Sequence, residues 1–230
     1  MNGILLVDKP YGWTSFDVVN YVRKIIAVAE GKKPKHVKVG HTGTLDPLAT
    51  GLLVLLIGSY TRRASEFVKL DKTYEATMKL GEVSTTGDAE GEKTIVSDKQ
   101  PTQAEIVGAL EKFTGDIMQT PPAFSALKVG GQRAYALARQ GRAVKLEPRA
   151  VKVYKSKLIS YEYPIVKFTC EVSSGTYIRS LVEDLGQTLT TGAYLTDLCR
   201  SQIGPFNIGE ALKPEGLNPE VIQAHLNKID

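Results

Sequence analysis

The chain contains the loop Gly40-His41-Thr42-Gly43-Thr44-Leu45-Asp46-Pro47-Leu48-Ala49-Thr50-Gly51, followed at once by six apolar residues, 52–57. The glycines free the backbone of this loop, and Pro47 stiffens it. The apolar residues predict a buried central strand, which holds Asp46 at a strand edge. A carboxylate held there suits a nucleophile or a general base, and it equally suits a turn cap, because Asp before Pro is common in turns. The local pattern leaves both interpretations open.

The segments on either side of this loop alternate between strand and helix patterns. Residues 3–7 are apolar, and residues 72–80 and 166–172 alternate between apolar and polar side chains, which predicts strands. Thr14 and Thr102 are each followed three residues later by an acid, the spacing of a capping box at a helix start. The apolar stripes of the predicted helices are Phe16, Val19, Val22 and Ile26; Ile106, Ala109, Leu110 and Phe113; and Ile178, Leu181, Val182, Leu185 and Leu189. Because no regular βαβ repeat is present, we expect an α+β fold with a mixed, largely antiparallel central sheet flanked by helices.

Length and composition restrict the class of protein. The 230 residues are 42% hydrophobic and 23% charged, which excludes a disordered tail and a fibrous repeat. No apolar run approaches the roughly 20 residues of a membrane-spanning helix, and the N-terminal residues lack a secretory signal pattern. Cys170 and Cys199 have no Cys or His partners at ligand spacing, so we expect a cytoplasmic protein without a metal site. No linker-like stretch divides the chain, and a single domain over residues 1–230 is expected.

Positive charge is concentrated in one part of the chain. The net charge is +4, yet residues 126–157 carry nine basic residues against the single acid Glu147, so the remainder is negative. The basic residues are Lys128, Arg133, Arg139, Arg142, Lys145, Arg149, Lys152, Lys155 and Lys157. This distribution fits binding to a polyanion such as nucleic acid, and it also fits a solvated helix and hairpin.

The loop quoted above strongly resembles the signature of the TruB family of tRNA pseudouridine synthases. Other stretches resemble the family in order and spacing, and the resemblance spans about residues 3 to 210. These stretches are Leu6-Val7-Asp8-Lys9-Pro10, Lys72-Thr73-Tyr74-Glu75-Ala76, Tyr135-Ala136-Leu137-Ala138-Arg139-Gln140-Gly141, Ser174-Gly175-Thr176-Tyr177-Ile178-Arg179 and Asp184-Leu185-Gly186. The resemblance implies a pseudouridine synthase fold with a thumb-like RNA-binding insertion at about residues 124–152.

The resemblance also implies an activity and a set of site residues. The activity is isomerisation of uridine-55 in the T loop of tRNA to its C5-glycoside, with no cofactor and no metal. The family's catalytic aspartate, tyrosine and arginine fall on Asp46, Tyr74 and Arg179. By the same resemblance His41 inserts where the flipped uridine leaves, and Tyr177 and Leu198 line the pocket around it. Phosphate contacts are expected from Lys128, Arg139 and Arg142 in the insertion. The pair Arg62 and Arg63 is a second candidate for phosphate contact, and it fits a solvated helix start equally well.

Physical chemistry accommodates these roles. A carboxylate in a pocket closed to water has its pKa raised by desolvation, and a nearby guanidinium such as that of Arg179 offsets this. Tyr74 points inward from its predicted strand, where its ring can stack on a base or simply fill the core. A base stacked in an RNA loop must be extruded before it can react. Whether Asp46 attacks C1′, attacks C6 or acts as a base stays open.

The sequence departs from the family pattern in two ways, and two other functions compete with this interpretation. Many family members continue into a small C-terminal RNA-binding domain of the PUA type, which is not expected here, and Cys199-Arg200 has one basic residue fewer than the usual pair. A catalytically idle RNA chaperone is one competing function, and a hydrolase built on Asp46 and His41 is another. The hydrolase lacks a Ser or Cys nucleophile motif and a second carboxylate. We expect a monomer whose partner is tRNA.

Overall fold

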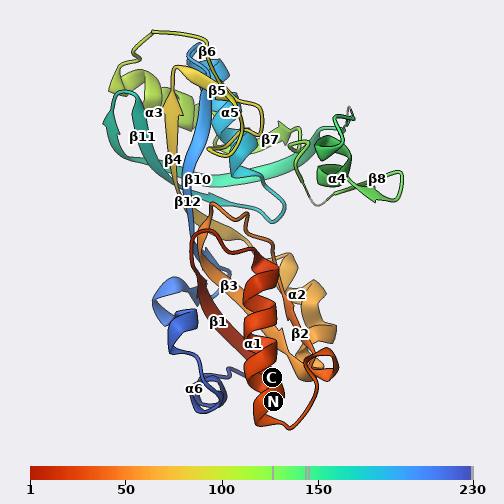
Figure 1. Cartoon of the computed structure of the whole chain (residues 1–230). Helices are drawn as coiled ribbons and strands as arrows, with labels where there is room; N and C mark the ends of the chain where they lie inside the picture. Colours follow the sequence, from red (N-terminus) through yellow and green to blue (C-terminus); the bar gives the residue numbers. More distant parts are fainter. Residues whose placement is uncertain (126, 143, 145, 229–230) are drawn as a thin grey trace. The chain divides into compact units, whose positions relative to one another are not determined.

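The chain folds as two compact units (Figure 1). A computed structural model describes residues 1–125, 127–142, 144 and 146–228, leaving aside the side chains of Lys128 and Arg133. Unit 1 comprises Met1–Tyr74 and Leu198–Asp230, and unit 2 comprises Glu75–Asp197. The boundary between the units falls within two strands, β4 (Lys72–Leu80) and β12 (Ala193–Ile203).

Helices and strands are mixed along the chain. The helices are α1 (Ser15–Ala29), α2 (Ala64–Val68), α3 (Gln103–Lys112), α4 (Ala134–Arg139), α5 (Ile178–Thr188) and α6 (Pro219–Ala224), with 3₁₀ turns η1 (Pro34–His36), η2 (Gly58–Arg63), η3 (Ile208–Glu210) and η4 (Pro214–Gly216). The other strands are β1 (Gly3–Lys9), β2 (Val39–His41), β3 (Thr50–Ile57), β5 (Glu82–Ser84), β6 (Lys93–Ile95), β7 (Gly115–Gln119), β8 (Lys128–Val129), β9 (Gln132–Arg133), β10 (Arg149–Glu162), β11 (Ile165–Val172) and β13 (Phe206–Asn207). None of the helices in the described ranges is long and apolar enough to cross a membrane.

Most strands belong to one sheet, whose order is β1-β3-β12-β4-β11-β10-β7, with β2 on β3 and β13 on β12. The pairs β1–β3, β2–β3, β10–β11, β10–β7 and β12–β13 are antiparallel. The pair β12–β3 is parallel. The predicted α+β class with a mixed, largely antiparallel sheet is therefore confirmed.

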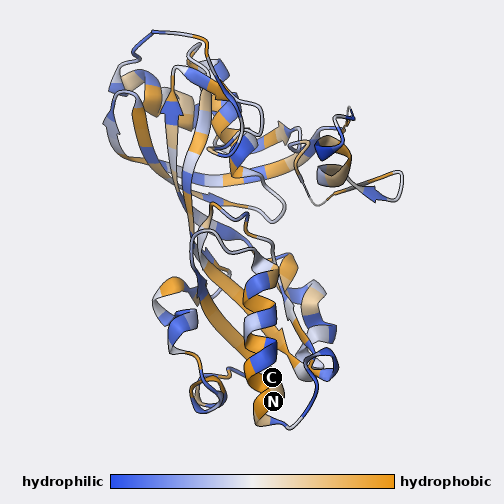
Figure 2. Ribbon diagram, in the orientation of Figure 1, coloured by the Kyte–Doolittle hydropathy of each residue, from blue (hydrophilic) through white to orange (hydrophobic). Residues whose placement is uncertain are grey.

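Unit 1 is built on two almost completely buried strands, β1 and β3, which are coloured largely as hydrophobic in Figure 2. One face of this pair packs against α1, and the other packs against Phe67 and Phe206. The capping box predicted at Thr14 is present: Thr14 Oγ1 accepts from the amide of Asp17, and Asp17 Oδ2 accepts from the amide of Thr14 at 2.8 Å. The predicted stripe was wrong at Phe16, which is 57% exposed and lies beneath the guanidinium of Arg23.

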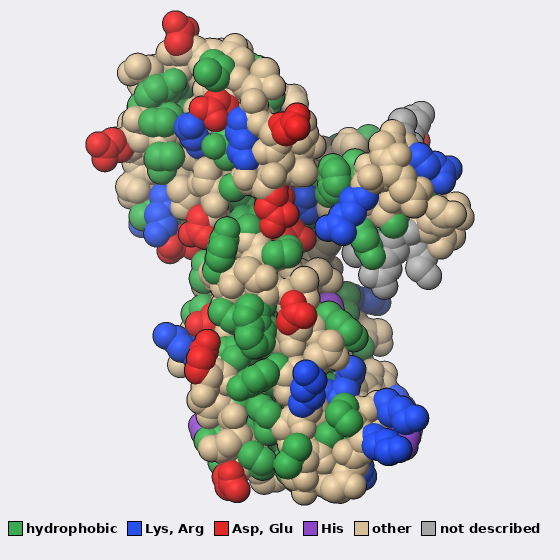
Figure 3. Space-filling view, viewed as in Figure 1, with side chains coloured by type: hydrophobic (Ala, Val, Ile, Leu, Met, Phe, Trp, Pro, Cys, Tyr) green, Lys and Arg blue, Asp and Glu red, His purple; other side chains and the backbone are tan. Residues whose placement is uncertain are grey.

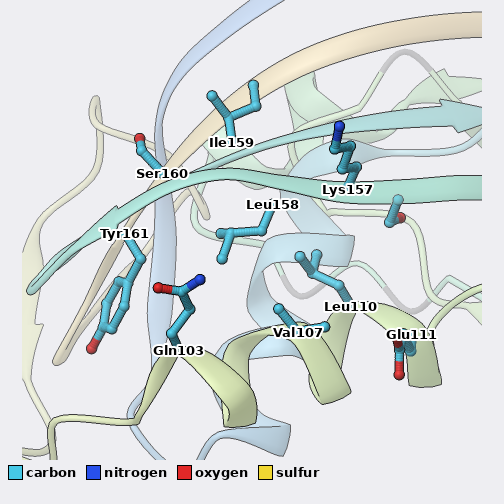
Figure 4. Close-up of a pocket in the computed structure, with 10 residues that line it drawn as sticks. Gln103, Val107, Leu110, Glu111, Lys157, Leu158, Ile159, Ser160 and Tyr161 are labelled. Atoms are coloured by element: carbon cyan, nitrogen blue, oxygen red, sulfur yellow. The ribbon is translucent and has the colours of Figure 1, made fainter.

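Unit 2 is built around β10, β11 and most of β4, with helices α3 and α5. The alternation predicted for β4 and β11 is observed as alternating burial. Phe113 lies just beyond the end of α3 and is half-buried, which corrects its predicted place in the buried stripe. A cavity of about 400 Å³ lies between α3 and β10, lined by Val107, Leu110 and Tyr161 among others (Figure 4). It contains none of the predicted site residues.

Candidate active site

The loop of residues 40–51, hereafter the reaction loop, is pinned to unit 1 on both sides of Asp46. Ser15, which is 2% exposed at the start of α1, donates to the carbonyl of Leu45 at 3.1 Å and accepts from its amide at 2.8 Å. The carbonyl of Pro47 accepts from the amide of Gly12 at 2.8 Å. Asp46 is half-buried between these two anchors, and its carbonyl accepts from Ala49 at 3.0 Å. The backbone that carries the predicted reacting acid is thus held in one conformation.

A buried lysine at the end of β1 supports the same loop. Lys9 has no exposed surface, and its ammonium donates to the carbonyls of Pro10 at 3.0 Å, Trp13 at 2.6 Å and Pro47 at 3.3 Å. Burial lowers the pKa of Lys9 to about 8, an effect that the charge of Asp46 opposes and that of Arg200 reinforces. The acid and the buried ammonium are therefore close enough to interact electrostatically.

His41 ends β2, at the start of the reaction loop. Burial lowers the pKa of its imidazole, and the positive charge of Arg200 lowers it further. Both effects favour the neutral ring at physiological pH. Its Nδ1 atom is buried and has no hydrogen-bond partner within the described part of the chain. A neutral, half-buried ring at the edge of the loop is compatible with the predicted insertion into a base stack.

Unit 1 also contains the two predicted pocket residues Tyr74 and Leu198. Tyr74 is 7% exposed on the buried face of β4, and Leu198 is 8% exposed on β12. The carbonyl of Leu198 accepts from the hydroxyl of Thr50, in β3, at 3.4 Å. Four predicted site residues, His41, Asp46, Tyr74 and Leu198, therefore belong to one unit.

Arg179 lies in unit 2, in the first turn of α5, and is 6% exposed. Its guanidinium donates to the carbonyls of Thr86 at 3.2 Å and Phe124 at 2.8 Å, and it pairs with the carboxylate of Asp88 at 3.4 Å. Asp88 is itself 3% exposed and accepts from the hydroxyl of Thr86 and from the amide of Glu90. Sequence reasoning missed Asp88. Since Asp46 and Arg179 belong to different units, their pairing stays a prediction.

Tyr177, the N-cap residue of α5, is fixed by a buried amide that the sequence analysis also missed. Gln119, 1% exposed at the end of β7, donates to the carbonyl of Tyr177 at 3.0 Å and accepts from its amide at 2.8 Å. The guanidinium of Arg149 lies 5.0 Å from the centre of the Tyr177 ring, in cation–π geometry. The ring is thus held from the backbone and from one face.

The predicted phosphate-binding residues have unequal surroundings. On the face drawn in Figure 3, Lys and Arg side chains lie on the surface of both units. Arg139, at the end of α4, and Arg142 are exposed, and so is Arg62 in η2. Arg63 instead pairs with Glu66 at 3.0 Å and lies over the ring of Tyr60. The side chain of Lys128 lies outside the described residues. Of this set, Arg62, Arg139 and Arg142 offer exposed guanidinium groups.

Comparison with known proteins defines the class. Residues 31–178 match the family model described as "TruB family pseudouridylate synthase (N terminal domain)". With this match, the mixed sheet and the single-acid loop are those of a pseudouridine synthase. The chain belongs to the TruB family. The matched residues include His41, Asp46, Tyr74 and Tyr177 but end before Arg179 and Leu198.

Relatives match along the whole chain. The protein of Clostridium acetobutylicum named tRNA pseudouridine synthase B is 44% identical over 230 residues, covering 100% of this chain and 77% of the relative. The proteins of the same name from Clostridium novyi and Burkholderia pseudomallei are both 42% identical, and this chain covers 77% and 70% of them. Among solved structures, a chain of a Cbf5-Nop10-Gar1 complex is similar with a TM-score of 0.69 and 30% identity. That likeness covers 92% of this chain, which spans about half of the solved chain (52%).

Proposed function

We propose that this protein converts uridine-55 in the T loop of tRNA to pseudouridine, using Asp46 as the reacting carboxylate. The observation that carries the proposal is the fixation of Asp46: both its sequence neighbours are hydrogen-bonded to the α1 region, and a buried ammonium lies near it. Family membership supplies the reaction class, and the relatives named tRNA pseudouridine synthase B supply the substrate class.

The reaction requires a small set of groups. The N1–C1′ bond breaks, a C5–C1′ bond forms, and a proton leaves C5 while N1 gains one. An ionised carboxylate meets the central requirement by attacking C1′, attacking C6 or accepting a proton, and these three roles stay open. The proposal needs no metal or organic cofactor, so chelator treatment is expected to leave turnover unchanged.

The other two catalytic assignments are Tyr74 and Arg179. Tyr74 presents a buried ring for stacking on the uracil, with a hydroxyl that can help to remove the C5 proton. Arg179 carries a permanent charge and suits electrostatic stabilisation of the Asp46 carboxylate once RNA is bound. Its support is a buried guanidinium already held by two carbonyls and by Asp88.

Access to the base requires its extrusion from the T loop. We assign His41 to the vacated position in the stack, and Tyr177 and Leu198 to the walls of the base pocket. The neutral form of His41, favoured by burial, supports this role because an uncharged ring stacks without being desolvated as an ion. The exposed Arg62, Arg139 and Arg142 are assigned to backbone phosphates.

The test is pseudouridine mapping on a T stem-loop RNA incubated with the purified protein. We expect one modified nucleotide, at the position of uridine-55, and none in an RNA in which that uridine is replaced by cytidine. Tight binding of the RNA without any pseudouridine would instead support the competing function, a tRNA-folding chaperone. Modification at other uridines only would refute the assigned target.

A further inference from the structure

Arg200 is a buried arginine to which no role has been assigned. It lies on β12 with 1% of its surface exposed, and it pairs in register with Gly51 on β3. Its Nε donates to the carbonyl of Leu52 at 2.8 Å, and its Nη2 donates to the carbonyl of Gly43 at 3.0 Å. Burying a guanidinium to this degree destabilises the folded state unless its donors are hydrogen-bonded. Here two of the donors bond to backbone carbonyls.

The two carbonyls stand at the two ends of the segment that contains Asp46. Gly43 precedes Asp46 by three residues, and Leu52 directly follows the reaction loop. One planar, rigid group therefore connects the beginning and the end of this segment. Both of these bonds lie within unit 1.

Two glycines of the loop make room for this arginine. A Cβ on Gly51, whose φ is +100°, would overlap the backbone of Arg200. A Cβ on Gly43 would lie 3.4 Å from Nη1 of Arg200. The glycine spacing of the loop thus follows from the close approach of β12, in addition to the backbone freedom that glycine gives.

Leu198 connects this arrangement to the base pocket. Arg200 and Leu198 are two residues apart on β12, so their side chains leave the same face of the strand. Both are buried, and the Leu198 carbonyl accepts from the hydroxyl of Thr50, near the end of the reaction loop where β3 begins. Whatever fixes the loop to Arg200 therefore also fixes it relative to Leu198.

We propose that Arg200 is a positioning residue that clasps the chain on both sides of Asp46, at Gly43 and at Leu52, and so sets the place of Asp46 relative to the Leu198 side of the base pocket. The bonds that hold the loop to Arg200 are a property of the folded chain, whether or not RNA is bound. Its effect on turnover rests on the proposed function, in which Asp46 reacts with a base that Leu198 contacts. An arginine that only stabilised the core would change the free energy of unfolding and leave the bound geometry of Asp46 intact.

The first experiment separates positioning from stability. In Arg200→Lys the buried charge remains, but an ammonium lacks the planar fork that spans both carbonyls. We expect kcat on the T stem-loop RNA to fall on the order of 100-fold, while the Kd for the RNA stays within about twofold. Arg23→Lys is the matched control, because it makes the same change at another arginine of unit 1 that donates to a backbone carbonyl, that of Val39 at 3.1 Å. The control is expected to lower Tm and to keep kcat. A kcat for Arg200→Lys within about twofold of the wild type overturns the proposal.

The second experiment needs no activity. Amide hydrogen exchange in Arg200→Lys is expected to accelerate at Leu45 and Ala49, whose amides are bonded inside or beside the loop, and to stay slow along β1. Unchanged protection at Leu45 and Ala49 would overturn the clasp even if kcat fell. Should the wild type form no pseudouridine, the proposed function fails, and the exchange measurement still decides whether Arg200 holds the loop.

Discussion

The reaction loop and the predicted RNA-binding insertion at residues 124–152 differ in where their positive charges lie. Around the loop, Lys9 and Arg200 are almost completely buried and donate to backbone carbonyls. In the insertion, Arg139 and Arg142 are exposed beside a helix of only six residues, α4. Buried cations bonded to carbonyls fix the path of the chain, whereas exposed cations remain available to phosphates.

The proposed function accounts for this difference. A reacting carboxylate must be held to within a fraction of an ångström, which favours bonds that water cannot exchange. RNA backbone contacts tolerate movement, because most of their free energy comes from the release of counterions. The comparison predicts that changes at the loop act on turnover and changes at the insertion act on binding.

The largest effect is expected from Asp46→Asn. The change removes the charge and keeps the shape, so the anchors at Leu45 and Pro47 persist and the fold is retained. We expect kcat to fall by at least about 10³-fold with an unchanged Kd for the RNA. Asp8→Asn makes the same charge change elsewhere in unit 1 and is expected to keep turnover. Appreciable pseudouridine formation by Asp46→Asn would remove Asp46 from its assigned role.

The chain contains a buried ion pair and a more exposed one, and their contributions to stability can be compared. Asp88→Asn leaves the guanidinium of Arg179 buried without its carboxylate, and we expect a loss of about 3 kcal/mol in the free energy of unfolding. Glu66→Gln breaks the more exposed pair with Arg63 and is expected to lower the free energy of unfolding far less, because water screens that pair. Urea denaturation measures both. Equal losses in the two variants would mean that the buried pair of Asp88 and Arg179 stabilises the fold no more than the exposed pair does.

Local sequence patterns predicted the elements and the loop but not what holds the loop. The capping box at Thr14, the strand β4 and the buried strand after Gly51 follow from spacings of two to four residues, which a sequence displays directly. Phe16 fits a helical spacing but lies to one side of the buried face of α1, which begins at Ser15, and Phe113, the residue after the end of α3, is only half-buried.

Local spacing could not predict the long-range hydrogen bonds that hold the reaction loop and Tyr177. Ser15 meets Leu45 across 30 positions, Gln119 meets Tyr177 across 58, and Arg200 meets Gly43 across 157. Such pairs have no periodicity, and the bonds run to backbone groups that every residue possesses. The family resemblance supplied Asp46, Tyr74 and Arg179, but it identified none of the side chains that orient them.

The prediction that exposed arginines of the insertion act on RNA binding is tested by combining Arg139→Gln with Arg142→Gln. We expect RNA binding to weaken about tenfold at low salt, and the slope of log K against log salt to become shallower by up to about two. At saturating RNA kcat is expected to stay close to the wild-type value. The exposed pair Lys213→Gln and Lys228→Gln removes the same charge and is expected to change neither quantity. An unchanged salt slope in the arginine variant would mean that these side chains do not contact RNA.

The smallest effect is the pH dependence of stability that the buried Lys9 produces. Lys9 has a pKa of about 8 in the folded chain against 10.5 when unfolded, so unfolding takes up a proton between these values. The free energy of unfolding therefore rises with pH above 8, by at most about 1.4 kcal/mol per pH unit for this group. Burial raises the pKa of the Cys170 thiol to about 12, which acts in the opposite direction above pH 9.

Subtracting the unfolding curves of Lys9→Met from those of the wild type isolates the lysine, because Cys170 contributes equally to both. From pH 7 to pH 9 the free energy of unfolding of the wild type is expected to rise relative to that of Lys9→Met. The reason is that Lys9 becomes neutral in the folded wild type and its charge is no longer buried. Arg142→Gln serves as the exposed counterpart and is expected to give a pH-independent difference. Parallel curves for Lys9→Met and the wild type would show that Lys9 is solvated in the folded protein. In that case the cations near the reaction loop and those of the insertion would not differ in their electrostatic surroundings.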